Sequence, residues 1–138
     1  MAGQTEIEIA RQLFLAWSSG DADAPKKYLA GDAVLRDIVA GEDKVGWPAI
    51  RAFFADGVKA WPDLDLTPDQ YWLNDRGVAL SWLMTATVPD DRFGPAAKGK
   101  KWSSAGMTYL EFKDGKVTLE VDYHHGPNVM RSLGLAAP

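Results

Sequence analysis

The chain has 138 residues, of which 46% are hydrophobic and 25% charged, so one globular domain spanning residues 1–138 is expected. Its net charge of −4 argues against nucleic acid or an anionic membrane surface as a partner. The absence of cysteine excludes disulfides, thiolate catalysis and cysteine-based metal sites. Acidic residues come early, and no apolar run is long enough for a signal peptide or a membrane helix, so we expect a cytoplasmic protein.

Two helices are predicted at the start of the chain. Thr5 and Glu8 form a capping-box pattern ahead of an apolar stripe with spacings of three and four residues, which predicts a helix over 5–17. A shorter helix is expected to follow, with Pro25 near its start and Gly31 at its end.

A strand and a third helix are predicted next. Residues 33–39 alternate, which places Leu35 and Asp37 on one face of a strand. Pro48 stands at a first-turn position, and the apolar stripe behind it predicts a helix that reaches Trp61.

The second half of the chain has the residue pattern of a β-sheet. Four segments rich in β-branched and aromatic residues predict strands over 65–73, 77–88, 101–112 and 117–124. "NDRG" and "KDGK" are typical of hairpin turns that tolerate positive φ, whereas the connection 89–101 is long enough to be a lid or a rim. Pro127 begins a last short helix that Gly134 ends. Helices followed by an antiparallel meander indicate an α+β fold, with three N-terminal helices on one face of a curved sheet.

Opposite faces of the last predicted strand carry different chemistry. Glu120, Asp122 and His124 share one face, and the other is apolar. The apolar positions are Val117, Leu119, Val121 and Tyr123. The polar face is either washed by solvent or lines a pocket. Asp122 and His124 are about 6.5–7 Å apart along the strand, which lets both contact one small substrate.

Three stretches resemble the nuclear transport factor 2-like superfamily. They are "YLAGDAVLRDIVAG", "GWPAIRAFFADGVKAWPDLDL" and "GPAAKGKKWSSAGMTYLEFKDGKVTLEVDYHHGPNVMRSLGL". Ketosteroid isomerase, limonene epoxide hydrolase and the SnoaL-like polyketide cyclases share this fold, and the chain resembles the SnoaL-like members most. The resemblance implies a cone-shaped curved mixed sheet with the three helices on its concave face. It places the Asp122 side chain inside the cone, so the apolar face of the same strand lies on the outside of the sheet. A homodimer built sheet against sheet would cover that face.

Residue roles follow from the same resemblance. Asp122 falls where limonene epoxide hydrolases keep an acid/base aspartate, Asp37 where they hold a water-orienting asparagine, and His124 at a pocket-lining position. Leu35 replaces the partner tyrosine of those hydrolases, which disfavours their triad. We predict Asp122 as general base, His124 as the group that polarises a carbonyl or shuttles the proton, and Asp37 as the orienting or second acid/base group. His125 is expected to point away from the pocket.

The predicted substrate-binding residues combine aromatic, small and hydroxyl-bearing side chains on the cavity face. They are Trp17, Leu35, Phe54, Trp82, Trp102, Ser104, Gly106 and Thr108. No metal and no cofactor are expected. The six tryptophans in the chain could surround a cavity or simply pack a core, and the sequence leaves both interpretations open.

The expected function is that of a cofactor-independent acid/base enzyme acting on a small hydrophobic carbonyl or polyketide-like substrate, as an aldol cyclase, isomerase or dehydratase. Two alternatives stay open. One is water addition of the epoxide hydrolase type; the other is a noncatalytic domain that binds a hydrophobic ligand or dimerises. Burying two carboxylates without a cation is costly, which favours an enzyme over a mere binder.

Overall fold

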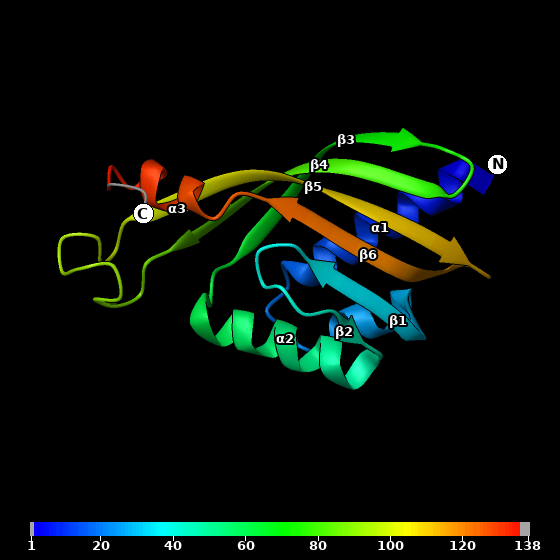
Figure 1. The fold of residues 1–138 in the computed structure, drawn as a ribbon, viewed down its shortest axis with the longest axis horizontal. Coiled ribbons are helices and arrows are strands. Elements are labelled where there is room, and N and C mark those ends of the chain that lie inside the picture. The colour runs from blue at the N-terminus through cyan, green and yellow to red at the C-terminus, as the bar shows by residue number, and fades with distance from the viewer. Residues whose placement is uncertain (1, 136–138) are drawn as a thin grey trace.

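The computed structural model describes residues 2–135, in which a strongly curved sheet carries the helices (Figure 1). In chain order the elements are α1 (Ala2–Trp17), the 3-10 helix η1 (Ala24–Tyr28), β1 (Leu29–Asp37), β2 (Lys44–Val45), α2 (Trp47–Ala60), β3 (Asp65–Leu73), β4 (Gly77–Thr87), β5 (Lys101–Lys113), β6 (Lys116–His124) and α3 (Pro127–Ser132). The four strands predicted in the second half are confirmed within one residue at each end.

The sheet has six strands in the order β2-β1-β6-β5-β4-β3. Strands β3 to β6 form an antiparallel meander, whereas β1 pairs with β6 in parallel. The sheet is therefore mixed, and the predicted α+β fold with helices before the meander is confirmed. The parallel pairing joins segments about eighty positions apart, because Asp37 lies opposite Asp122 in the register.

Helices α1 and α2 pack on the concave side of this sheet. α1 lies against β3 and β4, and α2 lies against β1 and β2. The two helices meet where Trp17 of α1 packs edge-on against Phe54 of α2 at 4.7 Å. The largest core side chains that are less than 2% exposed are Leu13, Phe14, Ile50, Leu80 and Leu110. Within the described residues no helix is both long and apolar enough to cross a bilayer.

The first two helices differ from their predicted bounds. α1 begins at Ala2, three residues before Thr5, so the capping-box pattern does not mark the start of the helix. The second helix is a single 3-10 segment that ends at Tyr28, because Leu29 already pairs with Val117 in the sheet. Gly31, the predicted helix stop, lies inside β1.

The two predicted hairpin turns are built differently. Asp114 and Gly115 adopt φ of 52° and 75°, as the Asp-Gly pair predicts. In the turn before Gly77, the Asn74 side chain accepts hydrogen bonds from the backbone N–H of Arg76 (2.8 Å) and of Gly77 (3.0 Å). That turn is therefore stabilised by a side chain rather than by the positive φ that the sequence suggested.

A bulge changes the phase of β6. Glu111 pairs with Leu119 and the next residue of β5, Phe112, pairs with Val117, so Thr118 is the extra residue. The prediction that Val117 lies on the outer face is wrong, because it is fully buried in the main core cluster. Beyond the bulge Glu120, Asp122 and His124 line the cavity as predicted and Tyr123 is 51% exposed on the outer face, but Val121, also predicted to lie outside, is only 4% exposed.

The close approach of Trp82 to Gly106 generates a stability prediction. A Cβ at Gly106 would lie 2.3 Å from Trp82 Cη2 and 2.8 Å from the Tyr123 carbonyl oxygen. Gly106→Ala should lower the free energy of unfolding by about 1–3 kcal/mol, measured by urea denaturation, because the tryptophan ring must shift. Gly31→Ala is the matched control, since a Cβ there meets nothing within 4 Å. Equal effects of the two substitutions would contradict this account.

Candidate active site

A cavity of about 460 Å³ lies between α1, α2 and the concave face of the sheet. Its walls are mostly apolar and aromatic, and its ionisable groups come mainly from the C-terminal ends of β1 and β6. The lining residues are Phe14, Trp17, Leu35, Asp37, Phe53, Phe54, Asp56, Gly57, Ala60, Trp61, Leu64, Leu66, Trp82, Met84, Thr108, Glu120, Asp122 and His124.

Eight of the predicted site residues line this cavity. They are Asp37, Asp122 and His124, with Trp17, Leu35, Phe54, Trp82 and Thr108. His125, expected to point away, is exposed. The structure thus brings the three predicted catalytic groups together in one apolar hollow, while their roles remain predictions.

Three predicted substrate-binding residues are not among the lining residues. Trp102 packs in a second core cluster with Leu133, because α3 folds back over β5. Ser104 is 3% exposed and lies on the cavity side of β5. Gly106 provides the room that the Trp82 ring occupies, so an aromatic side chain, and not a ligand, makes the close approach.

His124 and Asp37 form an ion pair at the end of the two parallel strands. His124 Nε2 lies 3.0 and 3.1 Å from the two carboxylate oxygens of Asp37, and the two side chains are 14% and 15% exposed. Asp37 also accepts hydrogen bonds from the backbone N–H groups of Val39 (2.9 Å) and Ala40 (3.0 Å). The backbone turn that follows β1 therefore fixes the Asp37 carboxylate, and this carboxylate in turn fixes the His124 imidazole.

Each member of the His124–Asp37 pair shifts the pKa of the other. Burial alone would raise the pKa of Asp37, but hydrogen bonds from His124 and Ala40 and the charge of His124 outweigh it, so the pKa is lowered. The hydrogen bond to Asp37 raises the pKa of His124 above its ordinary 6.5, against the opposing effect of burial. His124 is thus stabilised as the imidazolium, which is the form that can donate a proton.

Asp122 lies at the end of a hydrogen-bonded row that crosses β4, β5 and β6. Trp82 Nε1 donates to Thr108 Oγ1 at 2.9 Å, and the Thr108 hydroxyl donates to Asp122 Oδ1 at 2.7 Å. The register explains this row, because Thr108 is the direct partner of Asp122 in the sheet. Burial raises the pKa of Asp122, while the hydrogen bonds from Glu120 and Thr108 oppose that rise.

Glu120 is a cavity residue that the predicted site omitted. It is 3% exposed, accepts a hydrogen bond from Trp17 Nε1 at 3.1 Å and lies beside Asp122 on the cavity face of β6. Burial, followed by the nearby charge of Asp122, raises the pKa of Glu120 well above its ordinary value. Its shared strand face with Asp122 was the signal that could have included it.

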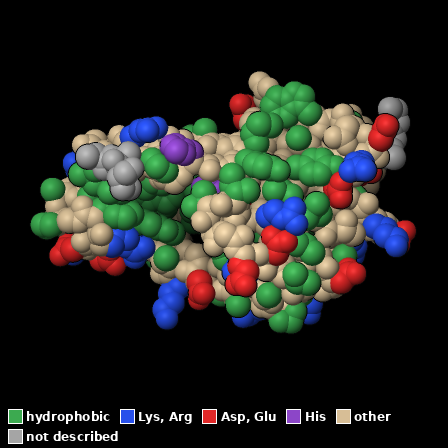
Figure 2. All heavy atoms as spheres, viewed as in Figure 1, with side chains coloured by type: hydrophobic (Ala, Val, Ile, Leu, Met, Phe, Trp, Pro, Cys, Tyr) green, Lys and Arg blue, Asp and Glu red, His purple; other side chains and the backbone are tan. Residues whose placement is uncertain are grey.

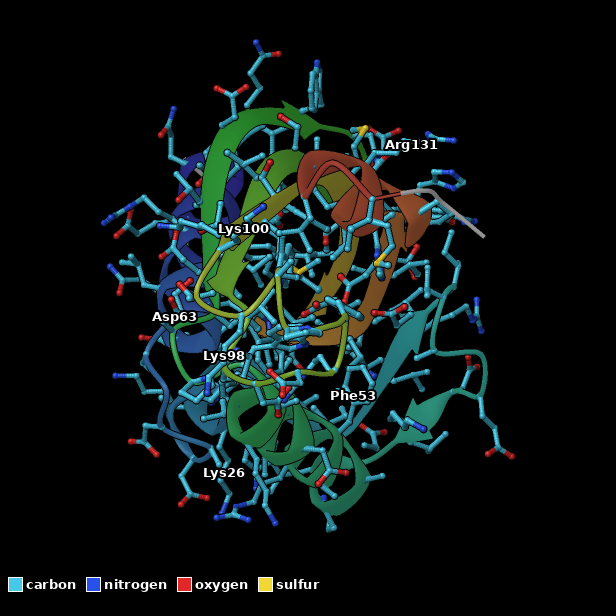
Figure 3. All side chains as sticks on the ribbon, turned by 90° about the vertical axis from the view of Figure 1, so that its left-hand side faces the viewer. Lys26, Phe53, Asp63, Lys98, Lys100 and Arg131 are labelled. Carbon is cyan, nitrogen blue, oxygen red and sulfur yellow. The ribbon has the colours of Figure 1, made fainter. Side chains whose placement is uncertain are left out.

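Aromatic residues and the long connection between β4 and β5 border the cavity at one end. Trp61 lines the cavity, its ring centroid lies 5.9 Å from that of Phe93 in the connection, and it lies 4.4 Å beneath the Arg92 guanidinium. Figure 3 faces this end and shows the connection, with Lys98 and Lys100, in front of the space between α2 and the strands. The connection therefore packs against a cavity residue, Trp61, although none of its own residues is among the lining residues.

A second hollow, of about 1010 Å³, is wider and more open. It lies beside η1, and its charged lining residues are all exposed. These are Asp21, Asp23, Lys26, Lys27 and Lys116. Although larger, it has no counterpart to the buried carboxyls and imidazole of the 460 Å³ cavity among its described lining residues, so the smaller cavity is the better candidate site.

A family model for the SnoaL-like domain matches residues 10–120. The chain belongs to the SnoaL-like domain family. The matched span contains β1, β2, α2 and β3 to β5, and it ends at Glu120 within β6, before Asp122 and His124. No curated protein sequence matches the chain.

Solved structures share the fold of this SnoaL-like protein. A protein from Acidithiobacillus ferrooxidans, named a "putative polyketide cyclase", has a TM-score of 0.82 and 25% identity over 94% of both chains. A second protein with that description, from Xanthomonas campestris pv. campestris, has a TM-score of 0.83 and 19% identity over 96% of this chain and 99% of that one. A Catenulispora acidiphila protein with a ketosteroid isomerase-like fold, in complex with trimethylamine, has a TM-score of 0.82 and 18% identity over 94% and 95% of the two chains.

The His124–Asp37 pair generates a pH-dependent stability prediction. Stabilisation through the raised pKa of His124 is complete below its ordinary 6.5 and is lost as the pH rises through the raised value. Stabilisation through the lowered pKa of Asp37 is present above its ordinary 3.8 and is lost as the pH falls through the lowered value. Asp37→Asn keeps an oxygen for the backbone N–H groups but removes the charge. Between these two ordinary values it should therefore cost about 1–3 kcal/mol in urea unfolding.

Two observations accompany that measurement. The difference between wild type and Asp37→Asn should shrink as the pH rises past the raised pKa of His124, and the His124 titration followed by NMR should move down in the variant. A His124 midpoint that is the same in both proteins would contradict the pairing.

Proposed function

We propose that this protein is a cofactor-independent acid/base enzyme of the cyclase or isomerase type, acting on a small hydrophobic carbonyl compound. Membership of the SnoaL-like family supports an activity of this type, and the names of the similar structures point the same way. The observation that carries the proposal is the Asp122 carboxyl in a mostly apolar cavity, next to an imidazole held by Asp37.

Asp122 acts as the general base in this proposal. Its carboxylate removes a proton from the carbon next to the substrate carbonyl, and the bonding electrons move onto the carbonyl oxygen as an enolate. Burial raises the proton affinity of the carboxylate, which makes it a stronger base than an exposed aspartate. The protonated Asp122 then returns the proton to another carbon in an isomerisation, or to the new alkoxide after an aldol ring closure.

His124 stabilises the developing enolate in this proposal. Its Nε2 is bound to Asp37, so Nδ1 is the nitrogen that would meet the carbonyl oxygen. The imidazolium favoured by Asp37 can donate a hydrogen bond or the proton itself to that oxygen. Asp37 orients and charges the imidazole and does not itself touch the reacting atoms.

The charge of the cavity restricts the substrate class. Among the described lining residues there are four carboxyl groups, one imidazole and no lysine or arginine. An anionic substrate would therefore face carboxylates without a free cation to offset them. The proposed substrate is neutral, with a flat apolar body that fits against Trp17, Phe54 and Trp82.

Epoxide hydrolysis is less well supported. Asp37 occupies the place proposed for a water-orienting group, yet its oxygens already bind His124 and two backbone N–H groups. Leu35 occupies the place of the partner tyrosine. A purely noncatalytic binding domain has no evident use for Glu120 and Asp122 side by side, because burying carboxyls costs free energy.

The test is turnover of a panel of polyaromatic ketones and related cyclic carbonyl compounds by Asp122→Asn. The amide cannot take up the proton, so kcat/KM should fall by about 100-fold or more, while the circular dichroism spectrum and melting temperature stay close to wild type. Asp69→Asn, an exposed position on β3, is the matched control and should keep full activity. Unchanged turnover in Asp122→Asn would remove that residue from the mechanism.

We also propose that two copies of the chain pair through the outer face of the sheet. Hydrophobic side chains gather there over β3 to β5 (Figure 2). Leu83, Met107 and Tyr123 are 45%, 42% and 51% exposed, and the register places them on neighbouring strands. An exposed apolar patch of this kind on a sheet is typical of an interface, and a twofold pairing covers it on both copies at once.

Met107→Glu should therefore give a monomer in analytical ultracentrifugation where the wild type gives a dimer. A charge at the centre of the outer face disrupts an apolar interface. Leu15→Glu on α1, where Leu15 is 50% exposed on a different side of the domain, is the control and should leave the dimer intact. A monomeric wild type would refute the interface.

A further inference from the structure

Glu120 is the one buried ionisable group of the cavity that the proposed mechanism does not use. It occupies the floor of the cavity between Leu35 of β1 and Leu110 of β5, its direct neighbours in the sheet. Both leucines are 3% exposed or less. The carboxyl group therefore has apolar partners on either side and the Trp17 indole as its hydrogen-bond donor from α1.

The ionised form of Glu120 is poorly supported in this position. The cavity's described lining residues include no lysine or arginine to pair with it. The other titratable groups that face the cavity are Asp122 and His124 on the same strand, Asp37 on β1 and Asp56 on α2. The only cation among them, His124, is already bound to Asp37.

The two neighbouring carboxyls of β6 differ in their hydrogen bonds. Asp122 receives the Thr108 hydroxyl at 2.7 Å, which in turn is fixed by Trp82. Glu120 receives a longer hydrogen bond, from the Trp17 indole N–H at 3.1 Å. Two carboxyl groups in contact share one proton when burial disfavours two charges, and the proton stays on the group with the poorer donors. That group is Glu120.

We propose that Glu120 is a positioning residue that keeps one proton on the cavity floor and donates it in a hydrogen bond to Asp122, so that Asp122 is ionised and fixed in place before substrate binds. Asp122 then accepts from Thr108 and from Glu120. Trp17 links the pair to α1, and its ring lies edge-on against Phe54 of α2 at 4.7 Å. The catalytic meaning of this arrangement rests on the proposed function, whereas the protonated pair can be measured without a substrate.

The experiment is carbon NMR of the whole protein with labelled glutamate and aspartate carboxyl groups. At about pH 7, where ordinary glutamates are ionised, one glutamate signal should lie at the position of a protonated acid. It should be absent in Glu120→Gln and present in Glu42→Gln, which removes an exposed carboxyl in the loop after β1. A wild-type spectrum in which every glutamate is ionised at this pH would overturn the proposal.

The titration of Asp122 separates positioning from simple packing. Glu120→Gln keeps an oxygen for Trp17 and an N–H for Asp122, so the Asp122 midpoint should stay close to that of the wild type. Glu120→Leu fits between two leucines but donates nothing, and the Asp122 midpoint should rise by about one to two pH units. Equal midpoints in the two variants would refute the hydrogen bond. The wild-type and Glu120→Gln spectra still decide the protonation if Glu120→Leu does not fold.

Failure of this proposal differs from failure of the proposed function. A protonated Glu120 with the predicted titrations, in a protein in which Asp122→Asn turns over normally, would leave the carboxyl pair standing and remove Asp122 as the base. Loss of turnover in Asp122→Asn together with a fully ionised Glu120 would keep the base and refute the shared proton.

Discussion

The parallel pairing of β1 with β6 is the constraint on which the candidate site depends. It sets Asp37 opposite Asp122, and the next residue on the same face of β6, His124, then reaches the Asp37 carboxylate. Parallel strands cannot be joined by a tight turn, and here most of the domain lies between the two. The ionisable groups of the cavity therefore come together only when the sheet is complete, so that folding and assembly of the site are one event.

The cavity combines groups whose burial is unfavourable with partners that offset the cost in different ways. Asp37 and His124 neutralise each other, Asp122 is held by a hydroxyl, and Glu120 has its pKa raised well above the ordinary value. Removing charges from water is costly unless they are paired or become neutral. Different solutions within one small space separate the pKa values of neighbouring carboxyls, and such separation is what acid/base chemistry requires.

The tryptophans resolve the two interpretations that the sequence left open, because both apply. Trp17, Trp61 and Trp82 line the cavity, and two of them donate hydrogen bonds to its polar groups. Trp102 packs in a second cluster, and Trp72 is 46% exposed on the outer face of β3. An indole combines a large apolar surface with one N–H donor. The cavity tryptophans can therefore form an apolar wall and still orient a hydroxyl or a carboxyl group.

The sequence by itself determined the strands of the meander, the third helix and the side of β6 on which Asp122 and His124 lie, because alternation and turn residues act over a few positions. It also carried the family resemblance. Tertiary structure decided the rest. A bulge at Thr118 turned Val117 into the core, sheet pairing absorbed Gly31 into β1, and packing against Trp17 buried Glu120. The last two outcomes depend on partners about eighty to a hundred residues away, which no local pattern records, whereas the bulge depends on the register that β6 adopts against β5.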